Sequence, residues 1–415
     1  MEPIRLQRTT PEALATQARR PVDPKTLGEA AAIVEDVRCD GESALRAHAE
    51  RLGDIEPGAA LVIERAELER ALTQLEPRDR ALLERSAQRI RSFAESQREC
   101  LAPLDVAVEG GRAGHRWLPA AAAGAYAPGG RYPLPSSVLM TVIPARVAGV
   151  ESVWVASPRP APITLAAAAV AGADGLLAVG GAQAIAALAF GTLTPSADIV
   201  VGPGNRWVTA AKKYLVGEVG IDGLAGPSEL VVIADEDAEP RLVAADLLAQ
   251  AEHDIDAIPI LVTPSVALAD AVDSELLHQL EDLPTAATAA QAIRRNGVAI
   301  LVRDLVQAAE VSDRIAPEHL ELCVAAPRAL AERVRCYGGL FVGSASAEVF
   351  GDYGAGPNHV LPTGGGARFQ AGLSVATFLR ATTWLELADP GAFAEDAARL
   401  ARLEGLEAHA RATTR

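Results

Sequence analysis

Short apolar runs bounded by glycine, proline or aspartate recur from about residue 121 to about residue 343. Several of them are separated by alanine-rich stretches of helical length. Strands that alternate with helices in this way predict parallel sheets built from β–α–β units, and therefore an α/β fold. The runs that predict strands are SVWVAS, GLLAVGG, ADIVVGPG, ELVVIAD, IPILVTP, VAILVRD and GLFVG.

The first 120 residues have a different pattern. Residues 24–53 and 65–97 carry apolar side chains at helical spacing, and AALVIERAEL between them indicates one short strand. After about residue 372 the chain becomes polar and helical in pattern. The N-terminal third and the C-terminal tail are therefore expected to be mainly helical.

The strand runs fall into two groups that meet at GLAGPSE, a glycine- and proline-containing stretch. We expect the second group to complete its sheet with the earlier part of the chain, so that the first group forms an inserted domain. In chain order, we expect an N-terminal helical segment (residues 1–21), a first domain (22–123 with 228–371), an inserted second domain (124–227) and a helical tail (372–415).

Composition narrows the class of protein. The 415 residues are 49% hydrophobic but only 4% aromatic, which is typical of an α/β core of Ala, Val, Leu and Ile. A formal charge of -16 argues against a nucleic-acid partner. The N-terminus has no apolar secretory signal, and the most apolar window is interrupted by Asp174, so no membrane span is expected. Four widely spaced cysteines predict neither a disulfide framework nor a cysteine-ligated zinc. We expect a soluble cytoplasmic protein.

The stretch RIAPEHLEL places Glu318 beside His319, two titratable groups in an apolar setting. Pro317 favours a helix start there, which would let both side chains converge on one ligand. Cys323 follows His319 by one helical turn, the spacing of a Cys–His nucleophile pair. Burial as a small hydrophobic residue is the alternative interpretation of this cysteine.

Two strand–glycine–helix stretches, VGGAQAIAALAFG and VGPGNRWVTAAKKYL, are candidates for phosphate binding at a helix N-terminus. Neither is a complete dinucleotide motif, and both also suit tight packing turns. In LLAQAEHD, Gln250 and His253 share one helix face and suit either a metal or a polar surface.

Two further stretches contain candidate residues. VFGDYGAGPNHVLPTGGGARF carries Asp352 and His359 in an irregular segment of a kind that is often functional. LEGLEAHARAT carries Glu404 and His409, which by themselves suggest a solvated helix face.

Taken together, these motifs resemble the histidinol dehydrogenase family from about residue 25 to about residue 410. The motifs GAYAPGGRYPLPSSVLMTVIPARVAGV, GGAQAIAALAFGT, GPGNRWVTAAKKY, AGPSELVVIAD, DLLAQAEHD, APEHLEL and GDYGAGPNHVLPTGG carry the resemblance. The resemblance implies two incomplete Rossmann-like domains with small helical tails in a domain-swapped homodimer. It also implies oxidation of L-histidinol to L-histidine, through L-histidinaldehyde, with two NAD and one Zn²⁺ per site, the last step of histidine biosynthesis.

The same resemblance implies roles for individual residues. The zinc ligands would be Gln250, His253, Asp352 and His409, and the NAD contacts would be Tyr126, Gln183 and Asn205. The substrate contacts would be Ser228, His319, His359 and Glu404, together with the side chains on the zinc. The tail would reach the active site of the partner subunit, so Glu404 and His409 would act in trans.

The expected chemistry requires two bases. Oxidation of an alcohol to an acid takes two hydride transfers with a hydration between them. We assign His319 as the base for the alcohol and Glu318 as the group that activates water. Nitrogen and oxygen ligands suit a divalent ion that holds substrate in place. The alternatives are a related dehydrogenase of another small alcohol, such as a sulfonated diol, and a non-catalytic nucleotide- or metal-binding protein.

Overall fold

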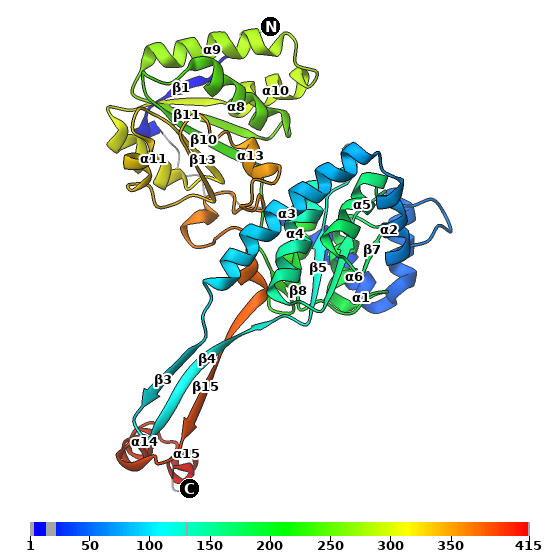
Figure 1. Cartoon of the computed structure of the whole chain (residues 1–415), viewed down its shortest axis with the longest axis vertical. Coiled ribbons are helices and arrows are strands. Elements are labelled where there is room, and N and C mark those ends of the chain that lie inside the picture. The colour runs from blue at the N-terminus through cyan, green and yellow to red at the C-terminus, as the bar shows by residue number, and fades with distance from the viewer. Residues whose placement is uncertain (1–3, 14–21, 130–131, 414–415) are drawn as a thin grey trace.

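The computed structural model describes residues 4–13, 22–129 and 132–413. These residues form two α/β domains and a long arm (Figure 1). Within the described residues, no helix is both long and apolar enough to cross a membrane.

The first domain is built on a six-stranded parallel sheet with the order β1-β12-β11-β10-β13-β14. Its strands are β1 (Gln7–Thr9), β10 (Glu229–Ala234), β11 (Ile258–Thr263), β12 (Val298–Leu301), β13 (His319–Cys323) and β14 (Gly339–Val342). One face is covered by α8 (Pro240–Glu252), α9 (Val266–Leu280) and α10 (Ala286–Asn296). The other is covered by α11 (Leu305–Ile315) and α12 (Pro327–Ala331), while the short α13 (Val349–Asp352) follows β14. Because both faces are buried, the central strands β10 and β11 are almost entirely apolar.

The second domain contains another six-stranded sheet, with the order β2-β7-β6-β5-β8-β9, in which only β2 is antiparallel to its neighbour. Its strands are β2 (Val62–Glu64), β5 (Ala122–Tyr126), β6 (Ser152–Ala156), β7 (Gly175–Leu177), β8 (Ile199–Val201) and β9 (Gly220–Ile221). One face carries α1 (Pro24–Leu52), α6 (Gly181–Phe190) and α7 (Arg206–Leu215). The other carries α2 (Arg65–Gln74), α3 (Pro77–Glu99), α4 (Pro135–Ala148) and α5 (Pro162–Ala171).

The α/β class and the parallel sheets are as predicted, but residues 22–123 are not where we expected them. They do not complete the first sheet. Instead, β2 pairs with β7, and the apolar faces of α1 and α3 pack on the second domain. The first sheet gains β1 as an edge strand paired with β12, in a segment that we expected to be helical. Part of that segment, residues 1–3 and 14–21, lies outside the described residues.

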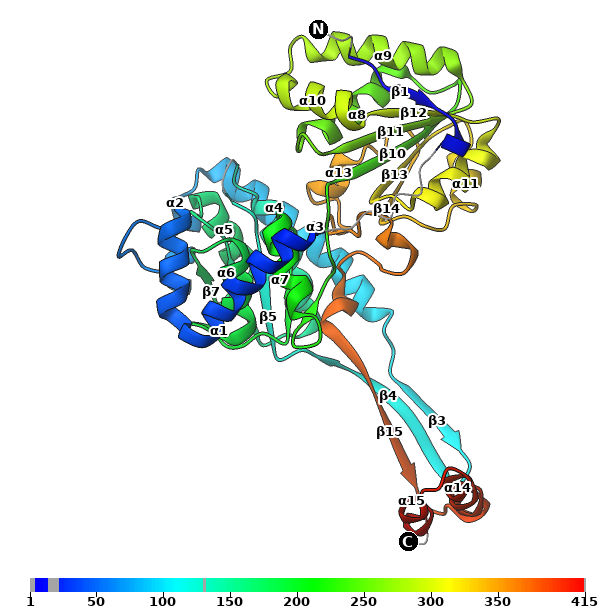
Figure 2. The same ribbon diagram turned by 180° about the vertical axis from the view of Figure 1, so that it is seen from behind.

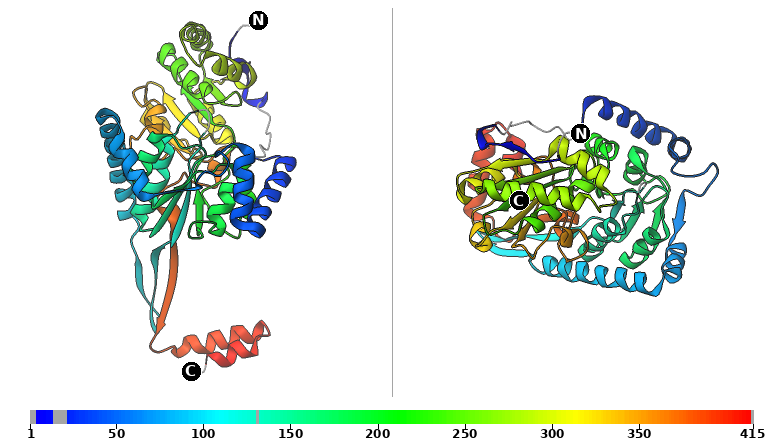
Figure 3. Two further views of the ribbon diagram at one scale, coloured as in Figure 1. Left: turned by 90° about the vertical axis from the view of Figure 1, so that its right-hand side faces the viewer. Right: turned by 90° about the horizontal axis from the view of Figure 1, so that it is seen from above.

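The arm is a three-stranded antiparallel sheet in the order β15-β4-β3, formed by β3 (Leu104–Val108), β4 (Gly111–Pro119) and β15 (Leu379–Leu387). It projects from the second domain and carries α14 (Gly391–Leu403) and α15 (Glu407–Ala412) at its tip (Figures 2 and 3). The predicted helical tail is thus helical only at its end, because the backbone of β15 is paired with β4 over nine residues.

Much of the arm's apolar surface is exposed. Every residue of β3 is exposed, and α14 presents Leu400 and Leu403 to solvent at 60% and 67%. A face of this kind on a protruding element is typical of an interaction surface.

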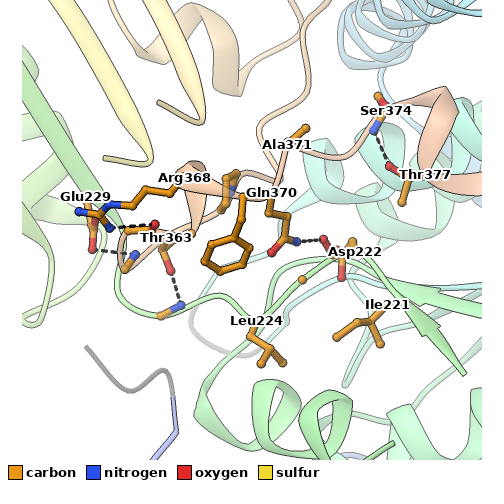
Figure 4. A pocket seen from close by; sticks show the side chains of 18 of the residues that line it. Ile221, Asp222, Leu224, Glu229, Thr363, Arg368, Gln370, Ala371, Ser374 and Thr377 are labelled. Carbon is orange, nitrogen blue, oxygen red and sulfur yellow. Dashed lines mark hydrogen bonds between the residues drawn. The ribbon is translucent and has the colours of Figure 1, made fainter. Parts of the chain in front are cut away.

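The two domains are joined by the segments around residues 222–228 and 353–378. A cavity of about 850 Å³ lies between these segments (Figure 4). There Gly226 donates its N–H to the Thr363 hydroxyl at 2.6 Å, and Gln370 donates to the Asp222 carbonyl oxygen. None of the predicted site residues lines this cavity.

Candidate active site

A smaller cavity of about 210 Å³ brings together six of the side chains that we singled out from the sequence. They are Ser228, His253, Glu318, His319, Asp352 and His359. Ser228 and Glu318 immediately precede β10 and β13, so the cavity lies at the amino ends of these strands. Ligands of open parallel sheets usually bind at the carboxyl ends. This part of the fold therefore departs from the usual arrangement.

Glu318 is held by two hydrogen bonds to one carboxylate oxygen. The Ser228 hydroxyl donates to Oε2 at 2.7 Å and the Glu229 backbone N–H donates at 2.9 Å. Burial raises the pKa of Glu318 to about 8, although the hydrogen bond from Ser228 opposes that shift. Glu318 is thus a fixed carboxyl group that exchanges a proton near neutral pH.

His319 is 3% exposed, and its Nδ1 lies 3.1 Å from the Glu229 carbonyl oxygen. A carbonyl oxygen only accepts hydrogen bonds, so Nδ1 carries the proton and Nε2 carries the lone pair. Nε2 is buried and has no hydrogen-bond partner in the part of the chain that the structure describes. Burial also lowers the pKa of His319 to about 4, which keeps the ring neutral and able to accept a proton.

Pro317 does not begin a helix, contrary to our expectation. Ala316 ends α11 in the left-handed conformation, and His319 is the first residue of β13. Hydrogen bonds to the start of β14 hold the chain in place where it enters β13. Gly338 and Gly339 donate their N–H groups to the carbonyl oxygens of Pro317 and Glu318. Glu318 and His319 nevertheless line one cavity, with Glu318 Oε2 3.7 Å from His319 Nδ1.

Three of the four predicted zinc ligands come from one region of the first domain. Gln250 lies in the last turn of α8, and His253 caps that helix. His253 Nε2 is 3.9 Å from Asp352 Oδ2, while both amide atoms of Gln250 are buried and none of the described residues bonds to them. A buried amide without partners is costly, so these atoms are suited to a ligand.

His359 is anchored on two sides. Its Nδ1 lies 3.1 Å from the Asp352 carbonyl oxygen, and its Nε2 lies 3.4 Å from the hydroxyl of Ser137 on α4. The long loop between α13 and β15 therefore brings a side chain of the first domain against a helix of the second. Burial lowers the pKa of His359.

The sequence reasoning missed a group of buried acids behind the cavity. Glu348 is 1% exposed, and Oε1 lies 3.6 Å from His319 Nδ1. Neither of its carboxylate oxygens has a hydrogen-bond partner within the described ranges. Burial and the neighbouring carboxylates raise its pKa. Ligand atoms of His319, Glu348 and Asp352 lie within 4.8 Å of one another, a grouping that could hold a metal ion.

The alternation of polar residues in β13 is the signal that could have revealed part of this group. His319, Glu321 and Cys323 occupy alternate positions and so face one side of the sheet. Glu321 is fully buried, and burial raises its pKa to about 8, with the Asp246 carboxylate as a further cause.

Cys323 shares a strand with His319, not a helix as the predicted pair requires. Its Sγ donates to Glu321 Oε1 at 3.2 Å, and burial raises the pKa of the thiol. A thiol held protonated in this way is a poor nucleophile, which favours the interpretation of Cys323 as a buried small residue.

A second cavity, of about 580 Å³, brings together Tyr126, Gln183 and Asn205. It lies at the carboxyl ends of β5, β7 and β8, where parallel sheets usually bind ligands. Asn205 also caps α7, since its Oδ1 accepts the N–H groups of Trp207 and Val208.

Glu404 and His409 do not join either cavity within the chain. Both are exposed, and they lie in the helical tip of the arm, well away from α13 and the first domain (Figure 1).

The two helix-covered sheets define a two-domain α/β protein, and the cavity that gathers Glu318 and His319 is its candidate active site. Comparison with known proteins identifies the family. Residues 17–415 match the histidinol dehydrogenase family. The chain belongs to this family and is an oxidoreductase with a role in histidine biosynthesis, as predicted.

Individual relatives match over nearly their whole length. The histidinol dehydrogenase of Cereibacter sphaeroides is 48% identical over 94% of this chain and 92% of its own. That of Thermus thermophilus is 46% identical over 96% of this chain and 97% of its own. The crystal structure of histidinol dehydrogenase from Elizabethkingia anophelis superposes with a TM-score of 0.91 at 31% identity, covering 99% of this chain and 97% of that one.

Proposed function

We propose that the protein oxidises L-histidinol to L-histidine through L-histidinaldehyde, with two NAD, as the last step of histidine biosynthesis. The observation that carries the proposal is the pairing of Glu318 and His319 in one cavity with His253, Asp352 and His359. Family membership supplies the substrate. None of the described residues that line the cavity is Lys or Arg, which argues against a sulfonated diol.

His319 acts as the base for the alcohol. Its Nδ1–H is directed to the Glu229 carbonyl oxygen, so the lone pair of Nε2 is available for the proton of the hydroxyl group. The carbon that bears this hydroxyl group then transfers a hydride to NAD.

Glu318 acts in the second stage. As the carboxylate it takes a proton from the water that adds to the aldehyde. The resulting hydrate then gives the second hydride to NAD. Ser228 and the Glu229 N–H fix the carboxylate in place for that proton transfer.

We assign the metal to Gln250, His253 and Asp352, with His409 of a second chain. The unpartnered Gln250 amide and the close approach of His253 to Asp352 fit a divalent ion with nitrogen and oxygen ligands. Zn²⁺ in this position would anchor the imidazole and amine of histidinol. We prefer this set to the grouping of His319, Glu348 and Asp352, because His319 is needed as a base.

We further propose a domain-swapped homodimer. Each chain lacks Glu404 and His409 at its own cavity but displays them at the tip of an arm with exposed apolar residues. Association of two arms would bury this surface and deliver both side chains to the partner subunit. A cytoplasmic location stays a prediction.

The test is an assay of NAD reduction with L-histidinol, before and after treatment with a chelator. Two NADH per L-histidinol, loss of activity with the chelator and recovery with Zn²⁺ are expected. One NADH per alcohol would contradict the four-electron reaction, and activity that resists complete removal of metal would contradict the zinc assignment.

A further inference from the structure

Asp54 lies beside the proposed NAD cavity although no motif pointed to it. Gly53 ends α1 in the left-handed conformation, and the N–H of Asp54 then bonds to the Ala49 carbonyl oxygen in a Schellman motif. This helix end carries the Asp54 carboxylate, which is 9% exposed, to the carboxyl edge of the second sheet.

The Asp54 carboxylate fixes the orientation of the Gln183 amide. Asp54 Oδ2 lies 2.9 Å from Gln183 Nε2 and 2.9 Å from the backbone nitrogen of Gly180. A carboxylate only accepts hydrogen bonds, so the NH₂ group of Gln183 must face it. Gln183 Oε1 is therefore an acceptor, and this buried atom has no hydrogen-bond partner among the described residues.

The same contacts occupy the glycine turn that the sequence suggested for phosphate. Gly180 donates its N–H to Asp54, and Gly181 donates its N–H to the Tyr126 hydroxyl at 3.2 Å. A negative side chain thus already occupies part of the N-terminus of α6, where a phosphate would otherwise bind. The free acceptor on Gln183 requires a ligand group that carries an N–H or O–H.

The position of the two cavities indicates which half of the cofactor this is. The nicotinamide ring must reach the cavity of His319 to receive the hydride. Among the described residues, none lines both cavities, but Gly204 lines the cavity of His319 and the next residue, Asn205, lines the cavity of Gln183. A dinucleotide that crosses this turn places its adenosine half beside Gln183.

We infer that Asp54 is a positioning residue of the cofactor site, which sets Gln183 as the acceptor for an N–H or O–H donor on the adenosine half of NAD. This inference rests on the proposed function. The donor is either the adenine amine or a ribose hydroxyl, and neither phosphate takes this place.

The first test is titration calorimetry of NAD and of ADP-ribose with Asp54→Asn. An asparagine can donate, so Gln183 is free to turn its NH₂ group toward the ligand and the acceptor is lost. Affinity for both ligands should fall about tenfold, with the KM for L-histidinol and the kcat at saturating NAD unchanged. Asp198→Asn is the matched control, because Asp198 accepts the N–H groups of Ala121 and Ala122 at the opposite end of the same sheet.

The second test identifies the donor. In the parent protein, either the hypoxanthine analogue of NAD, which lacks the adenine amine, or an ADP-ribose lacking a hydroxyl on the adenosine ribose should bind more weakly. That loss should disappear in Asp54→Asn. Unchanged affinity of the parent for all these analogues, or unchanged NAD affinity of a folded Asp54→Asn, would overturn the inference. A parent protein that neither binds NAD nor oxidises L-histidinol would instead refute the proposed function.

Discussion

Ser228 donates its hydroxyl proton to Glu318 Oε2 at 2.7 Å, across the start of two adjacent parallel strands. This bond stabilises the charged form of a carboxyl group that burial otherwise keeps protonated. It ties the proton affinity of the proposed water-activating base to one neighbouring hydroxyl.

Aldehyde oxidation should therefore respond to pH through Glu318. Its pKa is raised to about 8, so the carboxylate that accepts a proton from water becomes more abundant as the pH rises. The kcat/KM for L-histidinaldehyde should increase toward a plateau above about pH 8. Ser228→Ala should move the midpoint to higher pH, because the bond that favours the carboxylate is lost. A midpoint that moves to lower pH would contradict this role of Ser228.

Glu318→Gln should separate the two stages. The first hydride transfer, measured as NADH formed in a rapid single turnover of L-histidinol, should be retained. Oxidation of L-histidinaldehyde should fall by at least about 100-fold, because the amide cannot take a proton from water. Equal loss of both stages would rule out Glu318 as a group specific to the second.

Cys323→Ala should retain most of the activity, because the thiol is buried, protonated and directed at Glu321. Steady-state rates with L-histidinol and with L-histidinaldehyde are the measurement. A folded variant that is inactive only with the aldehyde would revive a covalent thiohemiacetal on Cys323.

Mixed dimers test the origin of His409. His253→Ala and His409→Ala subunits, each inactive alone, should regain activity when unfolded and refolded together. In such a hybrid one site receives both intact histidines and the other receives neither. Hybrids isolated with two different affinity tags provide the control, and inactive hybrids would show that His409 does not act in trans.

Glu321 should make the protein less stable as the pH rises. Its pKa is raised in the folded state, so between about pH 4.5 and about pH 8 the folded protein binds a proton that the unfolded chain does not. The free energy of unfolding should fall across this window, and the fall should be smaller in Glu321→Gln. Urea denaturation at both ends of the window measures the difference. Glu236→Gln, at an exposed position, should leave the slope unchanged.

The sequence predicted those parts of the fold that depend on local pattern. All seven apolar runs are strands, because β–α–β units bury strands on both faces and exclude polar residues from them. β13 was not predicted as a strand, because His319 and Glu321 are buried polar residues whose neighbours come from other elements. The arm was missed in part because β15 is held by pairing with β4, a segment far away in the sequence. Glu348 and Asp54 likewise acquire their surroundings only in the folded chain.

The pairing of β15 with β4 also determines when the arm can fold during translation. Residues 111–119 leave the ribosome long before their partner strand, because most of the two α/β domains lies between β4 and β15 in the sequence. Until then one edge of β4 has unpaired backbone groups, in a sheet with exposed apolar side chains. A nascent chain therefore cannot present a finished arm, and prematurely terminated chains lack both the third strand and the helical tip. Assembly through the arm would select for chains that have been translated beyond β15 and the helical tip.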